Sequence, residues 1–225
     1  MKAIIFDSGS LISLSMNGLL PELKKLKSFF DGKFIITEEV KREIIDKPLT
    51  IKRFELEALR LRQLLNEGVL ELPISLGIKK EELSKKTEEI SDIANRTFTA
   101  KGKEIHLIDS GETSCLALSR ILNEKKINNV IAVDERTTRM LGEKPENLQN
   151  LLQKKMHTQI KFNRENFKFF DGLKFIRSAE LVYVMHKKGV IQLDGETTLD
   201  ALLWAVKLNG CSISEDEIQE IKKIK

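Results

Sequence analysis

The sequence is poor in the residues from which many catalytic and metal sites are built. It has three histidines and two cysteines among 225 residues. The histidines show neither HxH nor HExxH spacing, which argues against a histidine-based metal site or general base. Cys115 and Cys211 lie in apolar, helix-like patterns without a metal-ligand spacing, which predicts reduced core thiols in a cytoplasmic protein.

Long apolar runs, targeting signals and repeats are also missing from the sequence. No run reaches the roughly 18 apolar residues of a membrane span. Asp7 interrupts the N-terminal apolar stretch, so we expect no signal peptide. Ser8 and Ser10 lack the setting of a nucleophile elbow, and Gly9 and Gly111 belong to no phosphate-binding loop. We therefore expect a cytoplasmic protein without a membrane segment.

The composition is typical of a soluble globular protein. Hydrophobic residues make up 41% of the chain and charged residues 32%. The length favours one domain with an appendage, and we divide the chain into a main domain at 1–158 and a mostly helical C-terminal extension at 159–225. The formal net charge of +4 permits an anionic partner.

Short apolar segments alternate with helix-like segments along the chain. Strands are expected at 3–6, 33–37 and 129–133, with a strand or a plain connection at 69–73 and an edge strand within 161–170. Residues 50–104 are expected to be mostly helical. Further helices are expected at 11–16, 21–30, 38–46, 109–122, 137–141, 145–156, 178–188, 197–208 and from 214 onward. The alternation predicts an α/β fold with a central parallel sheet.

Four acidic residues fall where such a fold brings side chains together. Asp7 and Asp134 each follow an expected strand, and the carboxyl ends of parallel strands border the crevice in which ligands bind. Glu112 lies in the first turn of a helix, and helical side chains tilt toward that end. Glu43 borders the apolar face of the helix that follows the second strand. We expect these four carboxylates to form one site.

A cluster of carboxylates points to a divalent cation. Crowded carboxylates repel one another and raise one another's pKa, and a cation relieves this repulsion. Mg²⁺ and Mn²⁺ prefer oxygen ligands, and a pair of such ions about 4 Å apart can activate a water and stabilise the leaving oxygen of a phosphodiester. An acidic crevice on a basic protein therefore suggests metal-assisted hydrolysis of a nucleic acid.

Each of these acids also has a structural interpretation that stays open. The two aspartates would serve as helix caps or turn residues, and Glu112 would complete a capping box with Asp109. Glu43 would be solvated, with Glu38 and Glu39 as competitors for its place in the site.

Four stretches of the chain, in this order, resemble the PIN-domain nuclease family, of the archaeal kind related to VapC-type toxin ribonucleases. The resemblance covers roughly residues 1–155, and its stretches are 4–8 (IIFDS), 36–44 (ITEEVKREI), 111–118 (GETSCLAL) and 130–139 (VIAVDERTTR). It implies a three-layer α/β/α sandwich with a central parallel sheet, and a Mg²⁺- or Mn²⁺-dependent endoribonuclease. The family's acidic quartet, which binds the metal and is catalytic, matches Asp7, Glu43, Glu112 and Asp134.

Two further positions match substrate-binding residues of the family. Ser8 matches the small hydroxyl residue after the first Asp, and Arg139 matches a recurrent Arg that would touch a phosphate. Many relatives carry a second Asp after the last acid, where this chain has Glu135. Whether Glu135 or Asp109 joins the site stays open.

The chain also departs from a minimal toxin in its length. The helical stretch between the second and third acids is long, and the residues after Gln159 are extra, which weakens the toxin assignment more than the nuclease one. The alternative function is a PIN-fold RNA-binding or ribosomal RNA maturation factor with little or no cleavage activity.

The second half of the chain leaves several partners open. Residues 153–188 carry nine basic and three acidic side chains. The interleaved phenylalanines would stack on RNA bases or belong to the core, with the lysines as a solvated face; they are Phe162, Phe167, Phe169 and Phe170. The apolar segment around Leu202, Leu203 and Trp204 would pack on the domain or form a homodimer interface. The RNA target and an antitoxin-like protein partner stay open.

Overall fold

The apolar run at the N-terminus forms the central strand of a parallel sheet. The computed structural model describes residues 1–224. In it, β1 (Lys2–Phe6) pairs with β2 (Lys33–Ile35) on one side and with β6 (Asn128–Ala132) on the other. β3 (Leu70–Glu71) and β8 (Phe175–Ile176) complete the order β3-β2-β1-β6-β8. All four pairings are parallel, which confirms the predicted α/β fold with a central parallel sheet.

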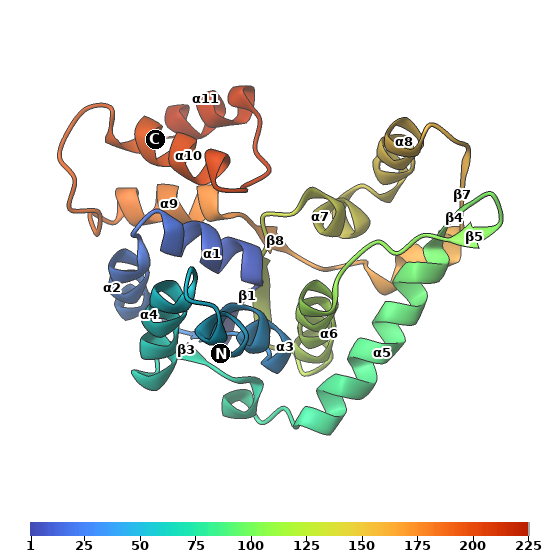
Figure 1. Ribbon diagram of the computed structural model, residues 1–225, viewed down its shortest axis with the longest axis horizontal. Coiled ribbons are helices and arrows are strands. Elements are labelled where there is room, and N and C mark those ends of the chain that lie inside the picture. Colours follow the sequence, from blue (N-terminus) through green and yellow to red (C-terminus); the bar gives the residue numbers. More distant parts are fainter. Residues whose placement is uncertain (225) are drawn as a thin grey trace.

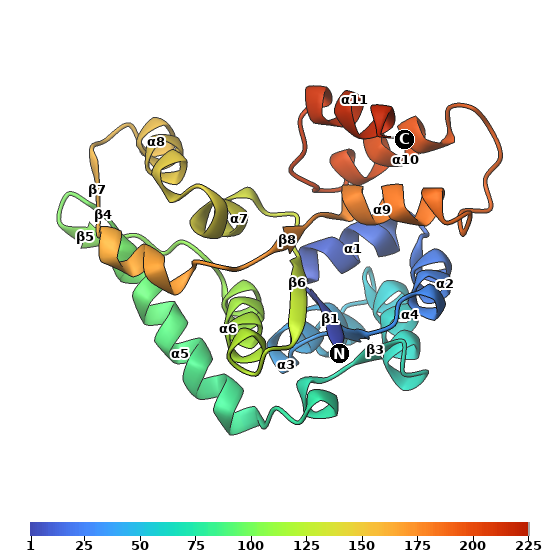
Figure 2. The same ribbon diagram turned by 180° about the vertical axis from the view of Figure 1, so that it is seen from behind.

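Helices cover both faces of this sheet. Their bounds are α1 (Ser8–Met16), α2 (Leu20–Phe29), α3 (Glu38–Lys41), α4 (Glu55–Asn66), α5 (Lys80–Thr97), α6 (Ser110–Glu124), α7 (Arg136–Glu143), α8 (Pro145–Met156), α9 (Ser178–Lys187), α10 (Thr198–Leu208) and α11 (Glu215–Lys223). Helix α9 contacts α1 and α2 on one side of the sheet, and α6 packs on β1 and β6 on the other, with α5 outside it (Figures 1 and 2). No helix within residues 1–224 is long and apolar enough to cross a membrane.

Shorter helical turns join these elements. The helix expected at 38–46 continues from α3 as a π-helical turn over Arg42–Asp46. Lys47 keeps helical φ and ψ angles and leads into the 3₁₀ turn that begins at Pro48. Short 3₁₀ helices lie at Pro48–Thr50, Pro73–Leu76 and Arg164–Phe169.

A second, antiparallel sheet lies at the end of α5 (Figure 1). β4 (Phe98–Ala100) pairs with β5 (Lys103–Glu104) and with β7 (Ile160–Phe162). The mostly helical prediction is wrong for residues 98–104. Lys101 and Gly102 have positive φ angles of 50° and 77°, so a two-residue hairpin turn joins β4 to β5.

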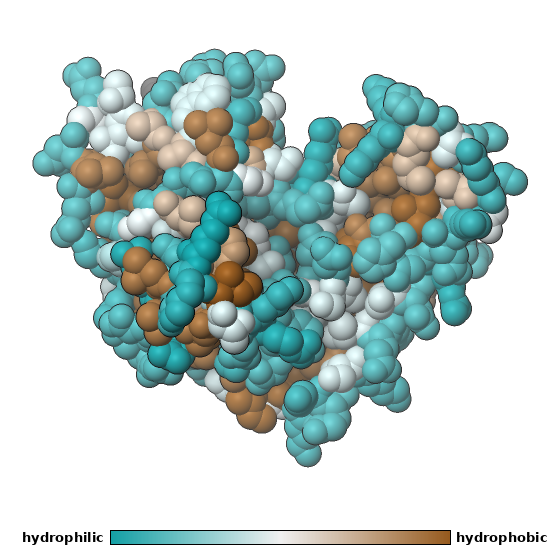
Figure 3. Space-filling view, in the orientation of Figure 1, coloured by the Kyte–Doolittle hydropathy of each residue, from teal (hydrophilic) through white to brown (hydrophobic). Residues whose placement is uncertain are grey.

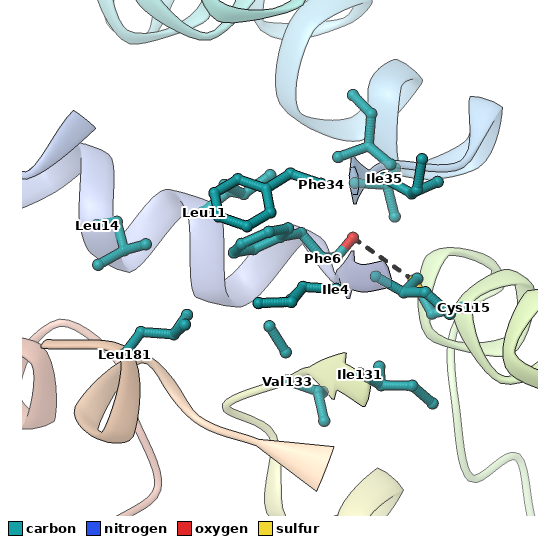
Figure 4. Close-up of a cluster of buried hydrophobic side chains, with 14 of the residues drawn as sticks. Ile4, Phe6, Leu11, Leu14, Phe34, Ile35, Cys115, Ile131, Val133 and Leu181 are labelled. Atoms are coloured by element: carbon teal, nitrogen blue, oxygen red, sulfur yellow. Dashed lines mark hydrogen bonds between the residues drawn. The ribbon is translucent and has the colours of Figure 1, made fainter. Parts of the chain in front are cut away.

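The core beneath the carboxyl end of β1 includes side chains from the last third of the chain. Phe6 packs edge-on against Phe34 of β2, with ring centroids 5.2 Å apart. Figure 4 shows these rings beside Leu11 of α1, with Leu181 of α9 on the same side of the sheet. Residues 159–225 thus contribute β8 to the sheet and Leu181 to this core, besides the three expected helices.

The aromatic and apolar residues of the C-terminal part are mostly buried. Phe167 and Phe170 belong to the core, whereas Phe169 is 38% exposed. Leu202 and Leu203 of α10 are buried within the chain. The core interpretation is therefore confirmed for two of the phenylalanines, and α10 packs against α9 and α11.

Candidate functional site

Asp7 sits at the junction of β1 and α1. Its Oδ2 accepts a hydrogen bond of 3.1 Å from the Gly9 N–H, so the carboxylate caps α1 as its structural interpretation predicts. The Asp7 N–H and the Ser10 hydroxyl both donate to the Ala132 carbonyl, at 2.9 and 3.0 Å, which ties the end of β1 to the end of β6. Asp7 Oδ1 is buried and has no hydrogen-bond partner within residues 1–224. A helix cap therefore also presents a free carboxylate oxygen.

Three of the four predicted acids line one pocket of about 380 Å³. Asp7 enters it from the end of β1, Glu43 from the π-helical turn and Glu112 from the first turn of α6. We name this space the acid pocket, and its lining residues are Asp7, Ser8, Gly9, Glu43, Asp109, Ser110, Glu112 and Glu135.

Glu43, and neither of its competitors, reaches the acid pocket. Glu38 and Glu39 line a separate cavity beside Pro73. A Cβ atom added to Gly111 would lie only 2.5 Å from Oε2 of Glu43. The glycine at the start of α6 therefore leaves room for the Glu43 carboxylate.

Two buried hydroxyls hold the start of α3 against α6. Thr37 Oγ1 accepts the Val40 N–H at 3.2 Å and so caps α3. The Thr37 and Ser114 hydroxyls share a hydrogen bond of 2.6 Å. Because Ser114 lies on α6, this bond fixes the helix before Glu43 relative to the helix that carries Glu112.

The acid pocket raises the pKa of two of its carboxyls. Burial raises the pKa of Asp7 to about 6, and the nearby charges of Glu43 and Asp134 act in the same direction. Burial and the charge of Asp7 raise the pKa of Glu112 to about 7. The ionised forms of these two carboxyls are therefore unfavourable by themselves, and a bound cation would stabilise them.

Glu112 also confirms the predicted capping box. Its Oε2 accepts a hydrogen bond of 3.1 Å from the Asp109 N–H. The structural and the chemical interpretations are compatible for this residue, because one oxygen caps the helix while the carboxyl group lines the acid pocket.

Asp134 lies beside the pocket and does not line it. The residue is buried, and Ser178 at the start of α9 donates to both carboxylate oxygens, the N–H to Oδ1 at 2.8 Å and the hydroxyl to Oδ2 at 2.7 Å. Glu135 lines the pocket instead and accepts the Thr138 N–H at 2.8 Å as the cap of α7. The role of Ser178 was not predicted: the sequence shows a serine at a helix start, where N–H groups are free, but not which acid it meets.

The two predicted substrate-binding residues occupy different places. Ser8 lines the acid pocket. Arg139 does not line it; its Nη2 donates to the Ser212 carbonyl at 3.0 Å, and its side chain lines a neighbouring cleft between α7 and the segment before α11. The structure therefore does not bring Arg139 to the acids.

The oxygen atoms of the acid pocket fit a hydrated divalent cation. Within residues 1–224, no three His, Cys, Asp or Glu side chains are arranged as a complete metal site. Mg²⁺, however, commonly keeps several waters and binds through one or two carboxylates. The free Oδ1 of Asp7, with Glu43 and Glu112 beside it, supplies such ligands.

The thiol nearest to the site is structural. Cys115 Sγ donates to the Phe6 carbonyl at 3.6 Å (Figure 4). Burial, with the charges of the surrounding acids, raises the pKa of this thiol well above its ordinary value. It therefore stays protonated, and both cysteines are buried and free of disulfide bonds, as predicted.

The acid pocket lies where ligands bind in open α/β sheets, at the carboxyl ends of the two strands where the connections change direction. Strands β2 and β3 lie on one side of β1, and β6 and β8 on the other. No protein-family model, no curated protein and no solved structure matches the chain, so the proposed function rests on this geometry and its chemistry.

Proposed function

We propose that the protein is a Mg²⁺- or Mn²⁺-dependent endoribonuclease of the PIN type. The observation that carries this proposal is the buried Oδ1 of Asp7, which has no partner within residues 1–224 and belongs to a pocket shared with Glu43 and Glu112. Three chain segments contribute these carboxylates, and burial makes the ionised forms of Asp7 and Glu112 unfavourable without a cation. The PIN resemblance of residues 1–155 and the parallel sheet support the same assignment.

The residues in and beside the acid pocket would have different roles. Asp7, Glu43 and Glu112 would hold the cation, with Asp134 behind Asp7. When bound, the cation would supply positive charge that acidifies water and stabilises charge on a phosphodiester. Without the cation, the pKa of Glu112 is raised to about 7, so its carboxyl would release its proton when the cation binds. Ser178 would keep Asp134 oriented through its two hydrogen bonds.

The second candidate is an RNA-binding or ribosomal RNA maturation factor with little cleavage activity. The engagement of both Asp134 oxygens by Ser178 favours it, because a carboxylate that already accepts two hydrogen bonds is less available to a metal. The two candidates differ in whether RNA is cut.

The deciding experiment is incubation of unstructured and structured RNA with the protein in Mn²⁺ or in EDTA. We expect cleavage by the wild type in Mn²⁺ only, and loss of cleavage in Asp7→Asn and Glu43→Gln. Glu39→Gln is the matched control, since Glu39 lies near Glu43 in sequence but lines another cavity. Equal cleavage by Asp7→Asn and the wild type would exclude the acid pocket as the active site, and no cleavage by the wild type would favour the second candidate.

A further inference from the structure

A second and larger hollow lies between helices α7 and α8 on one side and the C-terminal helices on the other. It has a volume of about 690 Å³ and separates α7 and α8 from the C-terminal segment of α10 and α11. Figure 3 shows the molecule notched between these two parts. We name it the basic cleft, and its lining residues are Arg136, Arg139, Met140, Glu143, Lys144, Asn147, Lys207, Cys211, Ser212, Ile213, Ser214 and Glu217.

The charge of the cleft is positive on both walls. Arg136, Arg139 and Lys144 line one wall and Lys207 lines the other, against two acidic residues. One of these acids, Glu217, is already paired with Arg177 at 2.7 Å. None of the four lining cations forms an ion pair within residues 1–224. The cleft therefore holds uncompensated positive charge.

Two of the four cations make no contact that stabilises the fold, whereas Arg139 and Lys207 donate to the Ser212 and Ile213 carbonyls. Arg136 is the first residue of α7, where a positive charge opposes the helix dipole. Neither Arg136 nor Lys144 makes a side-chain hydrogen bond or ion pair among the described residues, and both are exposed. Arg139 Nε is buried without a hydrogen-bond partner in residues 1–224. Donors left free in a cleft are suited to an anionic ligand.

The basic cleft and the acid pocket are lined in part by residues that are neighbours in the sequence. Glu135 lines the acid pocket and the next residue, Arg136, lines the cleft. The backbone carbonyl of Asp134 also accepts the Ser212 N–H at 3.1 Å, so the C-terminal wall of the cleft is attached to the last predicted acid. A strand lying in the cleft would therefore lead directly to the carboxylates.

We infer that the basic cleft binds the backbone phosphates of single-stranded RNA next to the point of cleavage. This inference rests on the proposed nuclease function for the identity of the ligand. Cations on opposite walls suit a strand that carries one charge per nucleotide better than a single small anion. They would also offset the repulsion between the phosphates and the acid pocket. The C-terminal segment then has a role, since Lys207 comes from it.

The test is RNA binding without metal. A fluorescent single-stranded RNA is titrated with protein in EDTA at several salt concentrations, and the anisotropy gives the affinity. Arg136→Ala/Lys144→Ala removes two cations that make no contact needed for folding. We expect about tenfold weaker binding, and a slope of log affinity against log salt that is smaller by about 1.4, since each phosphate contact contributes about 0.7 for a single strand.

Matched variants separate this effect from charge and folding. Arg62→Ala/Lys85→Ala removes two exposed cations from α4 and α5, outside the cleft, and should bind as the wild type does. Arg136→Lys/Lys144→Arg keeps both charges and should restore the salt slope. Unchanged affinity and slope in Arg136→Ala/Lys144→Ala, or an equal loss in the control pair, would overturn the inference.

The same samples distinguish this inference from the nuclease proposal. Asp7→Asn should bind RNA in EDTA at least as tightly as the wild type while losing cleavage in Mn²⁺. Cleavage by the wild type together with an unchanged salt slope in Arg136→Ala/Lys144→Ala overturns only the cleft. Binding that depends on Arg136 and Lys144, without any cleavage by the wild type, overturns only the nuclease.

Discussion

The raised pKa of Asp7 predicts that the metal-free protein loses stability as the pH rises. The pKa of Asp7 rises from its ordinary value of 3.8 to about 6 in the fold, chiefly because of burial. The folded state therefore holds this proton more tightly than the unfolded chain does. Its contribution to stability is complete below about pH 4 and is lost as the pH rises through about 6. At about 1.4 kcal/mol per pH unit, the loss from Asp7 is about 3 kcal/mol.

The substitution Asp7→Asn tests this directly, because it removes the charge and keeps an oxygen for the Gly9 N–H. In EDTA, the variant should match the wild type near pH 4 and exceed its free energy of unfolding by up to about 3 kcal/mol near pH 7.5. Urea unfolding at a series of pH values measures this difference. The carboxyl of Glu112, whose pKa is raised to about 7, should leave part of the pH dependence in the variant.

Mn²⁺ should remove most of this difference in stability between the two proteins. An ion that binds only the folded wild type at a hundredfold excess over its Kd adds about 2.7 kcal/mol, and Asp7→Asn should gain much less. Asp92→Asn changes an exposed aspartate of α5 and is the control that should follow the wild type. The reasoning is refuted if Asp7→Asn shows the same fall in stability with pH as the wild type, or an equal gain from Mn²⁺.

Three further substitutions test the parts that surround the site. Gly111→Ala places a Cβ against Glu43, so it should weaken the Mn²⁺-induced rise in Tm while changing stability by at most about 1 kcal/mol. Ser178→Ala removes one of the two donors to Asp134 and should lower the free energy of unfolding by about 1–3 kcal/mol. Phe34→Ala empties a fully buried site between β1 and α2 and should cost about 3–5 kcal/mol.

Each of these has a control of the same chemistry. Gly9→Ala places its Cβ at an ordinary 3.4 Å from Asp7 and should keep the Mn²⁺ response. Ser28→Ala and Phe29→Ala change exposed residues of α2 and should alter stability by no more than about 0.5 kcal/mol. A full Mn²⁺ response in Gly111→Ala, or core losses no larger than those of the surface controls, would contradict the corresponding role.

The parts of the site that sequence could predict are those set by local rules. An apolar run followed by Asp7 identified the central strand and its end, because a buried strand of a parallel sheet has a continuous apolar sequence. The hydroxyl of Thr37 and the carboxylate of Glu112 were recognisable as capping groups from their spacing to the following helix. The structure places Asp7, Glu43 and Glu112 in one pocket as expected.

The parts that sequence could not predict depend on contacts between distant segments. β8 has only two residues, too few to show a period, and it forms because β6 offers a free edge. Glu38, Glu39 and Glu43 are glutamates of the same predicted helix, so the sequence does not distinguish them. The π-helical turn, together with the space left by the missing side chain of Gly111, directs Glu43 into the acid pocket. The side chain of Arg139 donates a hydrogen bond to the Ser212 carbonyl and so does not line the acid pocket.

The central claim is that a divalent cation binds at the free oxygen of Asp7. Anomalous diffraction from crystals grown with Mn²⁺ tests it most directly, because the signal identifies the metal and its position. We predict an anomalous peak within coordination distance of Asp7 Oδ1, in the pocket shared with Glu43 and Glu112, and its loss in Asp7→Asn crystals. A pocket without a peak at saturating Mn²⁺, or a peak that persists in Asp7→Asn, would contradict it.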